Sequence, residues 1–231
     1  MLQAVFFDFD GVIADSEPRH LQAYQAVLRR DGIDLSREQY YERYLGYDDV
    51  GLFQALMEDR RLAIDGAKID EWIAAKSKLI ESLLSGDDVL FPGAVDCVQR
   101  CAAHVPLAVA SGALEPEIEL VLGHAGLRNS FKAIASASDG VRGKPAPDLY
   151  LLAIAKLRQF CAVDAGSSIA IEDSHWGLEA ARAAGLRCVA VTHTYEAGEL
   201  SGADLVVDSL GDITIPQLEQ IVRDARANPR S

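Results

Sequence analysis

The sequence is poor in the features on which secreted, thiolate-metal and nucleic-acid-binding proteins depend. It has 4 cysteines among 231 residues and no Cys-x-x-Cys pair, so neither a disulfide framework nor a thiolate zinc site is expected. Lys and Arg total 22 against 35 Asp and Glu, and the net charge of -13 argues against a nucleic-acid or anionic-membrane surface. No apolar run is long enough for a transmembrane helix, and no basic leader opens the chain. We therefore expect a cytoplasmic protein with reduced thiols and no nucleic-acid or membrane partner.

The chain is rich in apolar residues, and one short run of them is followed by acids. At 49% hydrophobic residues it can bury the core of one or two domains. The run 4–7 is typical of a central parallel strand, and it ends in Asp8, Phe9, Asp10 and Gly11. Burying two carboxylates at the end of such a strand costs free energy of folding unless a cation, such as a hard divalent metal ion, neutralises them. Alone, the pattern also fits a strand end with solvated acids and a turn glycine.

The segment after this strand has a helical period. Helices are expected at about 17–30, 36–44, 49–60 and 67–84, with no convincing strand among them. The turn-forming stretches 85–88 and 91–93 then form a hinge-like region. We predict an inserted all-helical domain over residues 16–90, with residues 1–15 and 91–231 forming the domain that contains the strands.

The rest of the chain alternates between strands and helices. Strands are expected at 107–110, 132–135, 168–171, 187–191 and 204–207, and helices at about 93–103, 115–125, 148–157, 175–184 and 216–226. Such alternation implies right-handed crossovers and a doubly wound parallel sheet of the α/β, Rossmann-like class.

Polar residues follow three of these strands, where parallel strands present their carboxyl ends to one edge. Ser111-Gly112 can bind a phosphate oxygen, although this is also ordinary turn chemistry. Lys144 stands before a proline, in an extended segment that can place its ammonium beside a carboxylate and a phosphoryl group. Glu172-Asp173 supplies a second acidic pair. Four acids, a lysine and a Ser-Gly turn at one edge predict a functional site rather than solvated surface.

The order of these groups resembles the four motifs of the haloacid dehalogenase superfamily. The motifs are Asp8-Phe-Asp10-Gly11, Ser111-Gly112, Lys144-Pro145 and Glu172-Asp173-Ser174-x-x-Gly177. The helical insertion after the first motif resembles the cap domain of the first subfamily, and the chain is most similar to beta-phosphoglucomutases and small-molecule phosphatases. The resemblance covers nearly the whole chain.

The resemblance implies a role for each motif residue. Asp8 would be the nucleophile that forms an aspartyl-phosphate, and Asp10 the general acid and then the general base. Ser111, Gly112 and Lys144 would hold the phosphoryl oxygens. The resemblance also implies Mg2+ as the cofactor. Its ligands would be the Asp8 carboxylate, the Asp10 main-chain carbonyl, Asp173 and, directly or through water, Glu172.

Two residues of the helical insertion are candidate substrate contacts. Lys76 falls within the apolar stripe of its helix, so it either snorkels from a core-facing surface or points into the cleft. Related caps place a substrate-contacting lysine nearby, which favours the cleft. His20, in the first helix of the insertion, lies where related mutases have a histidine that aids proton transfer or cap closure.

We therefore predict a phosphatase that acts on a small phosphorylated metabolite, such as a sugar phosphate or phosphoglycolate, with a monomer as the default state. A beta-phosphoglucomutase-type mutase is the alternative. Related mutases carry an arginine shortly after the cap glycine, whereas Gly46 is followed here by Tyr47, Asp48, Asp49 and Val50. Arg43 or Lys76 could substitute for that arginine. The third hypothesis is a catalytically silent binding protein on the same fold. The intact motifs count against it.

Overall fold

The computed structural model describes residues 1–45, 47, 49–62, 65–86 and 89–227. Over these ranges the chain forms two compact units, residues 1–15 with 87–231 and residues 16–86. Val89 and Leu90 belong to the first unit. The Asp15 N–H donates to the Val89 carbonyl (2.7 Å), and Leu90 forms a β-bridge with Ala14. Gly46 and Asp48 of the cap motif, and Asp87 and Asp88 of the hinge-like stretch, lie outside the described residues.

The first unit contains a sheet of six parallel strands within the described residues, in the order β3-β2-β1-β4-β5-β6. The strands are β1 (Ala4–Phe7), β2 (Leu107–Ala110), β3 (Phe131–Ala135), β4 (Ser168–Glu172), β5 (Arg187–Val191) and β6 (Leu205–Val207). The predicted doubly wound α/β fold is confirmed, and the expected strands differ from the observed ones by one residue at most at either end. The chain winds from β1 toward β3 and then returns past β1 to continue through β4. This reversal creates a topological switch point between β1 and β4.

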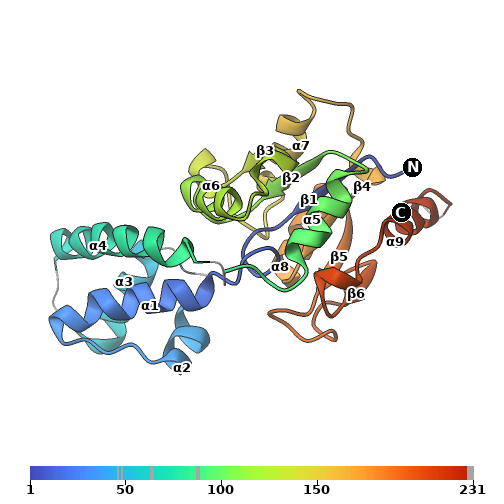
Figure 1. Ribbon diagram of the computed structural model, residues 1–231. Coiled ribbons are helices and arrows are strands. Elements are labelled where there is room, and N and C mark those ends of the chain that lie inside the picture. Colours follow the sequence, from blue (N-terminus) through green and yellow to red (C-terminus); the bar gives the residue numbers. More distant parts are fainter. Residues whose placement is uncertain (46, 48, 63–64, 87–88, 228–231) are drawn as a thin grey trace. The chain divides into compact units, whose positions relative to one another are not determined.

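Helices cover the sheet, as the ribbon diagram shows (Figure 1). They are α5 (Ala94–Ala102), α6 (Glu115–His124), α7 (Asp148–Leu157), α8 (His175–Ala183) and α9 (Ile215–Ala227). One hydrophobic cluster joins α7 and α8 to alternate strand residues, among them Phe6, Ala108 and Ala170. Residues two apart on a strand share a face, and the alanines among these positions, such as Ala108 and Ala170, let both helices approach the sheet closely. All four cysteines are free thiols, as expected.

The second unit, residues 16–86, is helical throughout its described part (blue to green in Figure 1). It contains α1 (Glu17–Leu28), the short α2 (Arg37–Gln39) continued by a π-turn at Tyr40–Tyr44, α3 (Asp49–Arg60) and α4 (Gly66–Leu84). Apolar residues at helical spacing form its own core, which includes Leu28, Phe53 and Trp72. Asp65 caps α4 by accepting the Lys68 N–H. Among the described helices, none combines the length and apolar character needed to cross a membrane.

Candidate active site

The switch point places the first and fourth motifs side by side. Phe7, the last residue of β1, pairs with Val109 of β2 and with Ile171 of β4. Asp8 therefore follows β1 directly between the ends of β2 and β4, and the residue after Ile171 is Glu172. Crevices outside the carboxyl ends of strands at such a point are where open α/β sheets bind ligands.

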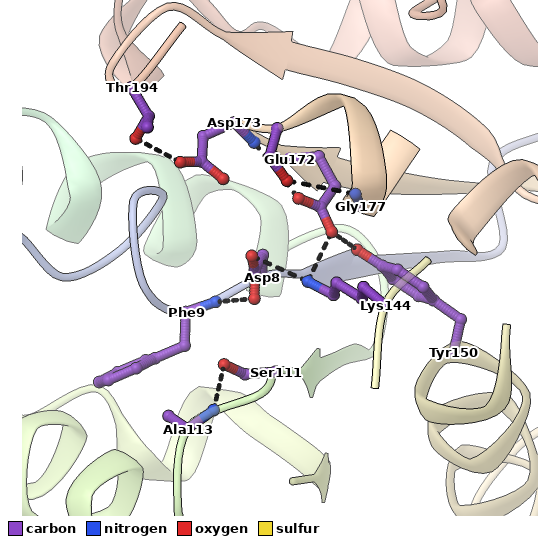
Figure 2. A network of polar contacts seen from close by, with 11 residues as sticks. Asp8, Phe9, Ser111, Ala113, Lys144, Tyr150, Glu172, Asp173, Gly177 and Thr194 are labelled. Carbon is purple, nitrogen blue, oxygen red and sulfur yellow. Dashed lines mark hydrogen bonds and ion pairs between the residues drawn. The ribbon is translucent and has the colours of Figure 1, made fainter. Parts of the chain in front are cut away.

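Three buried acids lie together at this edge, and two of them contact one lysine (Figure 2). Within the described part of the chain, Asp8, Glu172 and Asp173 can each offer a carboxylate oxygen, and these oxygens lie within 4.8 Å of one another. Lys144 Nζ lies 2.8 Å from Asp8 Oδ2 and 2.6 Å from Glu172 Oε1. The Phe9 N–H donates to Asp8 Oδ1 at 2.7 Å, so both oxygens of Asp8 are oriented by the protein.

The charges of this cluster do not balance among the described residues, since it contains three carboxylates and one ammonium group. Burial and then the neighbouring Asp8 carboxylate raise the pKa of Glu172 to about 8 and that of Asp173 to about 6. Burial alone would lower the pKa of Lys144, but Asp8 and Glu172 raise it above its usual value. A hard divalent cation would compensate two negative charges through oxygen ligands, so the donor set fits Mg2+.

The other predicted core residues lie at the same edge of the sheet. Ser111, which directly follows β2, is buried, and its Oγ accepts the Ala113 N–H at 3.1 Å (Figure 2). Gly112 is exposed, with open space around its Cα. Asp10 is half-buried in the turn after β1, where it forms a β-bridge with Ala14. Its side chain is not part of the group of three acids, which leaves its main-chain carbonyl as the predicted metal ligand.

Two hydroxyl groups that the sequence analysis missed hold the acids of the fourth motif (Figure 2). Tyr150, fully buried in α7, donates its hydroxyl hydrogen to Glu172 Oε1 at 2.6 Å. Thr194, in the segment after β5, donates to Asp173 Oδ2 at 2.5 Å. Tyr150 shares the apolar face of its helix and lies in the hydrophobic cluster, so helical periodicity alone does not mark it as a site residue. The signal that could have found it is its hydroxyl, because a buried tyrosine usually needs a hydrogen-bond partner.

The glycine of the fourth motif is required by the packing around Glu172. Gly177 lies in the first turn of α8, where its N–H donates to Ser174 Oγ at 3.2 Å. A Cβ on Gly177 would lie 2.0 Å from Glu172 Oε2, far inside van der Waals contact. Glu172 is fully buried and is already held by Lys144 and Tyr150, so moving its carboxylate would disturb both contacts.

We expect Gly177→Ala to reduce kcat/KM by about tenfold to a hundredfold, the usual cost of disturbing groups that orient an active site. The added methyl group must displace the Glu172 carboxylate and with it Lys144. Gly123→Ala is a matched control, because Gly123 is an exposed glycine in α6 with nothing within 4 Å of its Cβ position. Steady-state kinetics on both variants checks the prediction, and equal activities would show that Glu172 tolerates displacement.

The two predicted cap residues come together within the helical unit. Lys76 is buried, and its Nζ lies 2.7 Å from Asp49 Oδ1 and 4.9 Å from the centre of the Tyr24 ring. The Tyr24 hydroxyl donates to the same Asp49 oxygen. Burial and then the Lys76 ammonium lower the pKa of His20 to about 3, so this imidazole is neutral near pH 7. Lys76 contacts Asp49 directly, and His20 lies close enough for the charges of both residues to act on its pKa.

Comparison with known proteins gives relatives over most of the chain. The chain is 34% identical to protein CbbY (plasmid) of Cupriavidus necator, over 95% of this chain and 90% of the relative. It is 31% identical to fructose-1-phosphate phosphatase YqaB of Escherichia coli, over 81% of this chain and 95% of that protein. Among solved structures, CbbY from Rhodobacter sphaeroides in complex with phosphate matches with a TM-score of 0.82 and 28% identity, over 95% of this chain and all of that one.

A family model covers the motifs themselves. The model for the haloacid dehalogenase-like hydrolases matches residues 2–185, a range that begins before β1 and ends just after α8. It includes both acidic pairs, the Ser-Gly turn and the lysine described above. The resemblance inferred from the motifs is confirmed: this chain belongs to the haloacid dehalogenase-like hydrolases.

Proposed function

We propose that this protein is a Mg2+-dependent phosphatase that hydrolyses a small phosphorylated metabolite, most specifically a sugar phosphate, through an aspartyl-phosphate. The observation that carries the proposal is the cluster of Asp8, Glu172 and Asp173 around Lys144 at the switch point. It combines a nucleophilic carboxylate, a cation for phosphoryl oxygens and a donor set for a divalent metal ion. The family membership supports the same chemistry.

In the first step a carboxylate oxygen of Asp8 attacks phosphorus and displaces the alcohol. The Phe9 N–H and Lys144 Nζ hold the two oxygens of Asp8 and so restrict the direction of attack. Lys144, Ser111 and the exposed main chain of Gly112 then face the charge that accumulates on the phosphoryl oxygens.

Asp10 is assigned the proton transfers. Its carboxyl group protonates the leaving alkoxide, and the resulting carboxylate then takes a proton from the water that hydrolyses the aspartyl-phosphate. Asp8, the Asp10 carbonyl, Glu172 and Asp173 would hold Mg2+. The ion supplies charge compensation that lets an anionic nucleophile approach an anionic phosphate.

The names of relatives favour a sugar or sugar-alcohol phosphate as the substrate. The relatives include a fructose-1-phosphate phosphatase and hexitol phosphatase B of Escherichia coli, and a second structure of Rhodobacter sphaeroides CbbY is in complex with xylulose-(1,5)bisphosphate. In this proposal Lys76 and His20 are the cap-side contacts of the uncharged part of the substrate, which leaves the Lys76–Asp49 ion pair intact.

A mutase would need a second cation for the distal phosphate, and the candidates in the helical unit are already paired. Arg43 contacts Asp59 at 2.6 Å, and Lys76 contacts Asp49 at 2.7 Å. The Arg43 pair is largely exposed and therefore weak, so it would not by itself prevent phosphate binding. The buried Lys76 pair is a stronger argument, because breaking it would leave Asp49 with one partner fewer. Hydrolysis is thus favoured over phosphoryl return to the substrate.

The function is tested by measuring phosphate release from a panel of phosphorylated metabolites, with Mg2+ and with a chelator. The panel includes fructose 1-phosphate, hexitol phosphates, pentose phosphates and bisphosphates, phosphoglycolate and beta-glucose 1-phosphate. We expect release from one or a few sugar phosphates, with loss of activity in the chelator and recovery when Mg2+ is restored.

Other outcomes would change the assignment. Conversion of beta-glucose 1-phosphate to glucose 6-phosphate in the presence of a bisphosphate primer, without net release, would indicate a mutase. Release that persists in the chelator would contradict the metal requirement. No turnover of any panel member would favour a binding protein on the same fold.

A further inference from the structure

The segment that follows β5 contacts the candidate active site through two residues. Thr194 donates its hydroxyl hydrogen to Asp173 Oδ2, and His193 Nδ1 lies 2.9 Å from the main-chain oxygen of Gly11. The first contact reaches the acid of the fourth motif, and the second reaches the turn of the first motif. Neither residue belongs to a motif that the sequence analysis assigned to the chemistry.

The two points of contact are themselves packed against each other. Gly11 has a φ of +76°, and a Cβ at this position would lie 1.9 Å from Asp173 Oδ2. The oxygen that accepts the Thr194 hydroxyl is therefore the one that lies against the Gly11 backbone. The Asp173 carboxylate is confined on one side by a backbone that has no side chain and on the other by a hydrogen bond.

The segment is in turn anchored to the rest of the core. The His193 ring stacks on Phe91 with ring centres 4.0 Å apart and planes 15° apart. The Thr192 N–H donates to the Val207 carbonyl of β6 at 3.0 Å. These contacts fix the backbone from which the Thr194 hydroxyl is presented. A carboxylate held in one orientation by a rigid donor loses little entropy when it binds a cation.

We propose that Thr194 is a positioning residue for the cation site, which acts by holding Oδ2 of Asp173 so that the other oxygen is presented to the metal ion. The inference rests on the proposed function for the identity of the cation, Mg2+. It adds a determinant of metal affinity that lies outside the four motifs, at the carboxyl end of a further strand of the same sheet.

The test is calorimetric titration of Mg2+ alone into the metal-stripped, full-length protein. Thr194→Val removes the hydroxyl while nearly keeping the shape of the side chain, and should raise the Kd for Mg2+ about tenfold to a hundredfold. Thr194→Ser retains the donor and should bind as the wild type does. At saturating Mg2+ the kcat of Thr194→Val should return toward the wild-type value. General disruption of the site would instead lower kcat even when Mg2+ is saturating.

Thr192→Val is the matched control. Thr192 lies two residues away, and its hydroxyl donates to Asp208 at 3.2 Å rather than to an acid of the site. Unchanged Mg2+ affinity in Thr194→Val, or equal losses in the two valine variants, would overturn the inference. A wild type that binds Mg2+ but hydrolyses no phosphate ester would remove the proposed function and leave this inference in place, whereas a wild type that binds no Mg2+ would overturn both.

Discussion

Asp8→Asn should lower kcat by about four orders of magnitude or more, the range seen when the nucleophile of a covalent mechanism is removed. An amide oxygen carries no negative charge with which to attack phosphorus. Asp10, the other acid of the first motif, is outside the group that Asp8 forms with Glu172 and Asp173, so it is not expected to replace the nucleophile. The protein should still fold. One acid fewer beside Glu172 and Asp173 relieves repulsion among buried like charges, so its Tm without metal should equal or exceed that of the wild type.

The measurements are phosphate release at saturating substrate and thermal unfolding in the chelator. Asp34→Asn, at an exposed position in the helical unit, makes the same chemical change away from the site and should leave kcat unaltered. An active Asp8→Asn enzyme would show that another group, or water itself, attacks the phosphate. A sharply lower Tm would show instead that Asp8 is needed to balance Lys144 in the folded state.

Asp10→Asn should lower kcat on an alkyl phosphate by about a hundredfold to ten-thousandfold, the usual contribution of a general acid or base. Unlike Asp8→Asn, the Asp10→Asn enzyme should accumulate the aspartyl-phosphate intermediate. With an aryl phosphate the leaving group needs little protonation, so Asp8 should still be phosphorylated, whereas hydrolysis of the aspartyl-phosphate lacks its base. The main-chain carbonyl of Asp10 is untouched, so Mg2+ should still bind.

Rapid quenching followed by intact-mass measurement should therefore detect a covalent phosphoryl adduct in Asp10→Asn. Asp8→Asn is the control, because it removes the residue that would carry the adduct. Wild-type turnover of sugar phosphates by Asp10→Asn would exclude the proposed acid–base role. A large loss of turnover without any adduct would place the role of Asp10 in the first step alone.

The sheet and the motif residues could be predicted because the relevant signals are local. Each apolar run that was expected to form a strand does so, and Asp8, Ser111 and Asp173 follow their strands within one residue. In a parallel α/β sheet every such residue lies at the same edge, so position along the strand already indicates position in space. The boundary of the helical unit was harder to predict from the sequence, since the attachment of Val89 and Leu90 to the first unit depends on one hydrogen bond from Asp15 and on a bridge with Ala14.

The partners of the acids could not be predicted in this way. Tyr150 is 22 residues from Glu172, and Thr194 is 21 residues from Asp173. Whether a hydroxyl on a helix or a loop reaches a particular oxygen depends on crossover geometry and on side-chain rotamers, neither of which leaves a periodic signal. The pairing of Lys76 with Asp49 was hidden for the same reason, because helical spacing places a lysine on a face without identifying the acid opposite it.

The α/β class, the family and the motif residues Asp8, Asp10, Lys144 and Asp173 can be recognised in the sequence alone, because apolar runs and the residues that end them are read along the chain. The charge balance of the site and the contacts that orient its side chains depend on tertiary packing. Burial brings three acids together beside one lysine, and Gly177 leaves the space that Glu172 occupies. These features arise from close packing between segments far apart in sequence, where differences of one ångström decide which oxygen meets which donor.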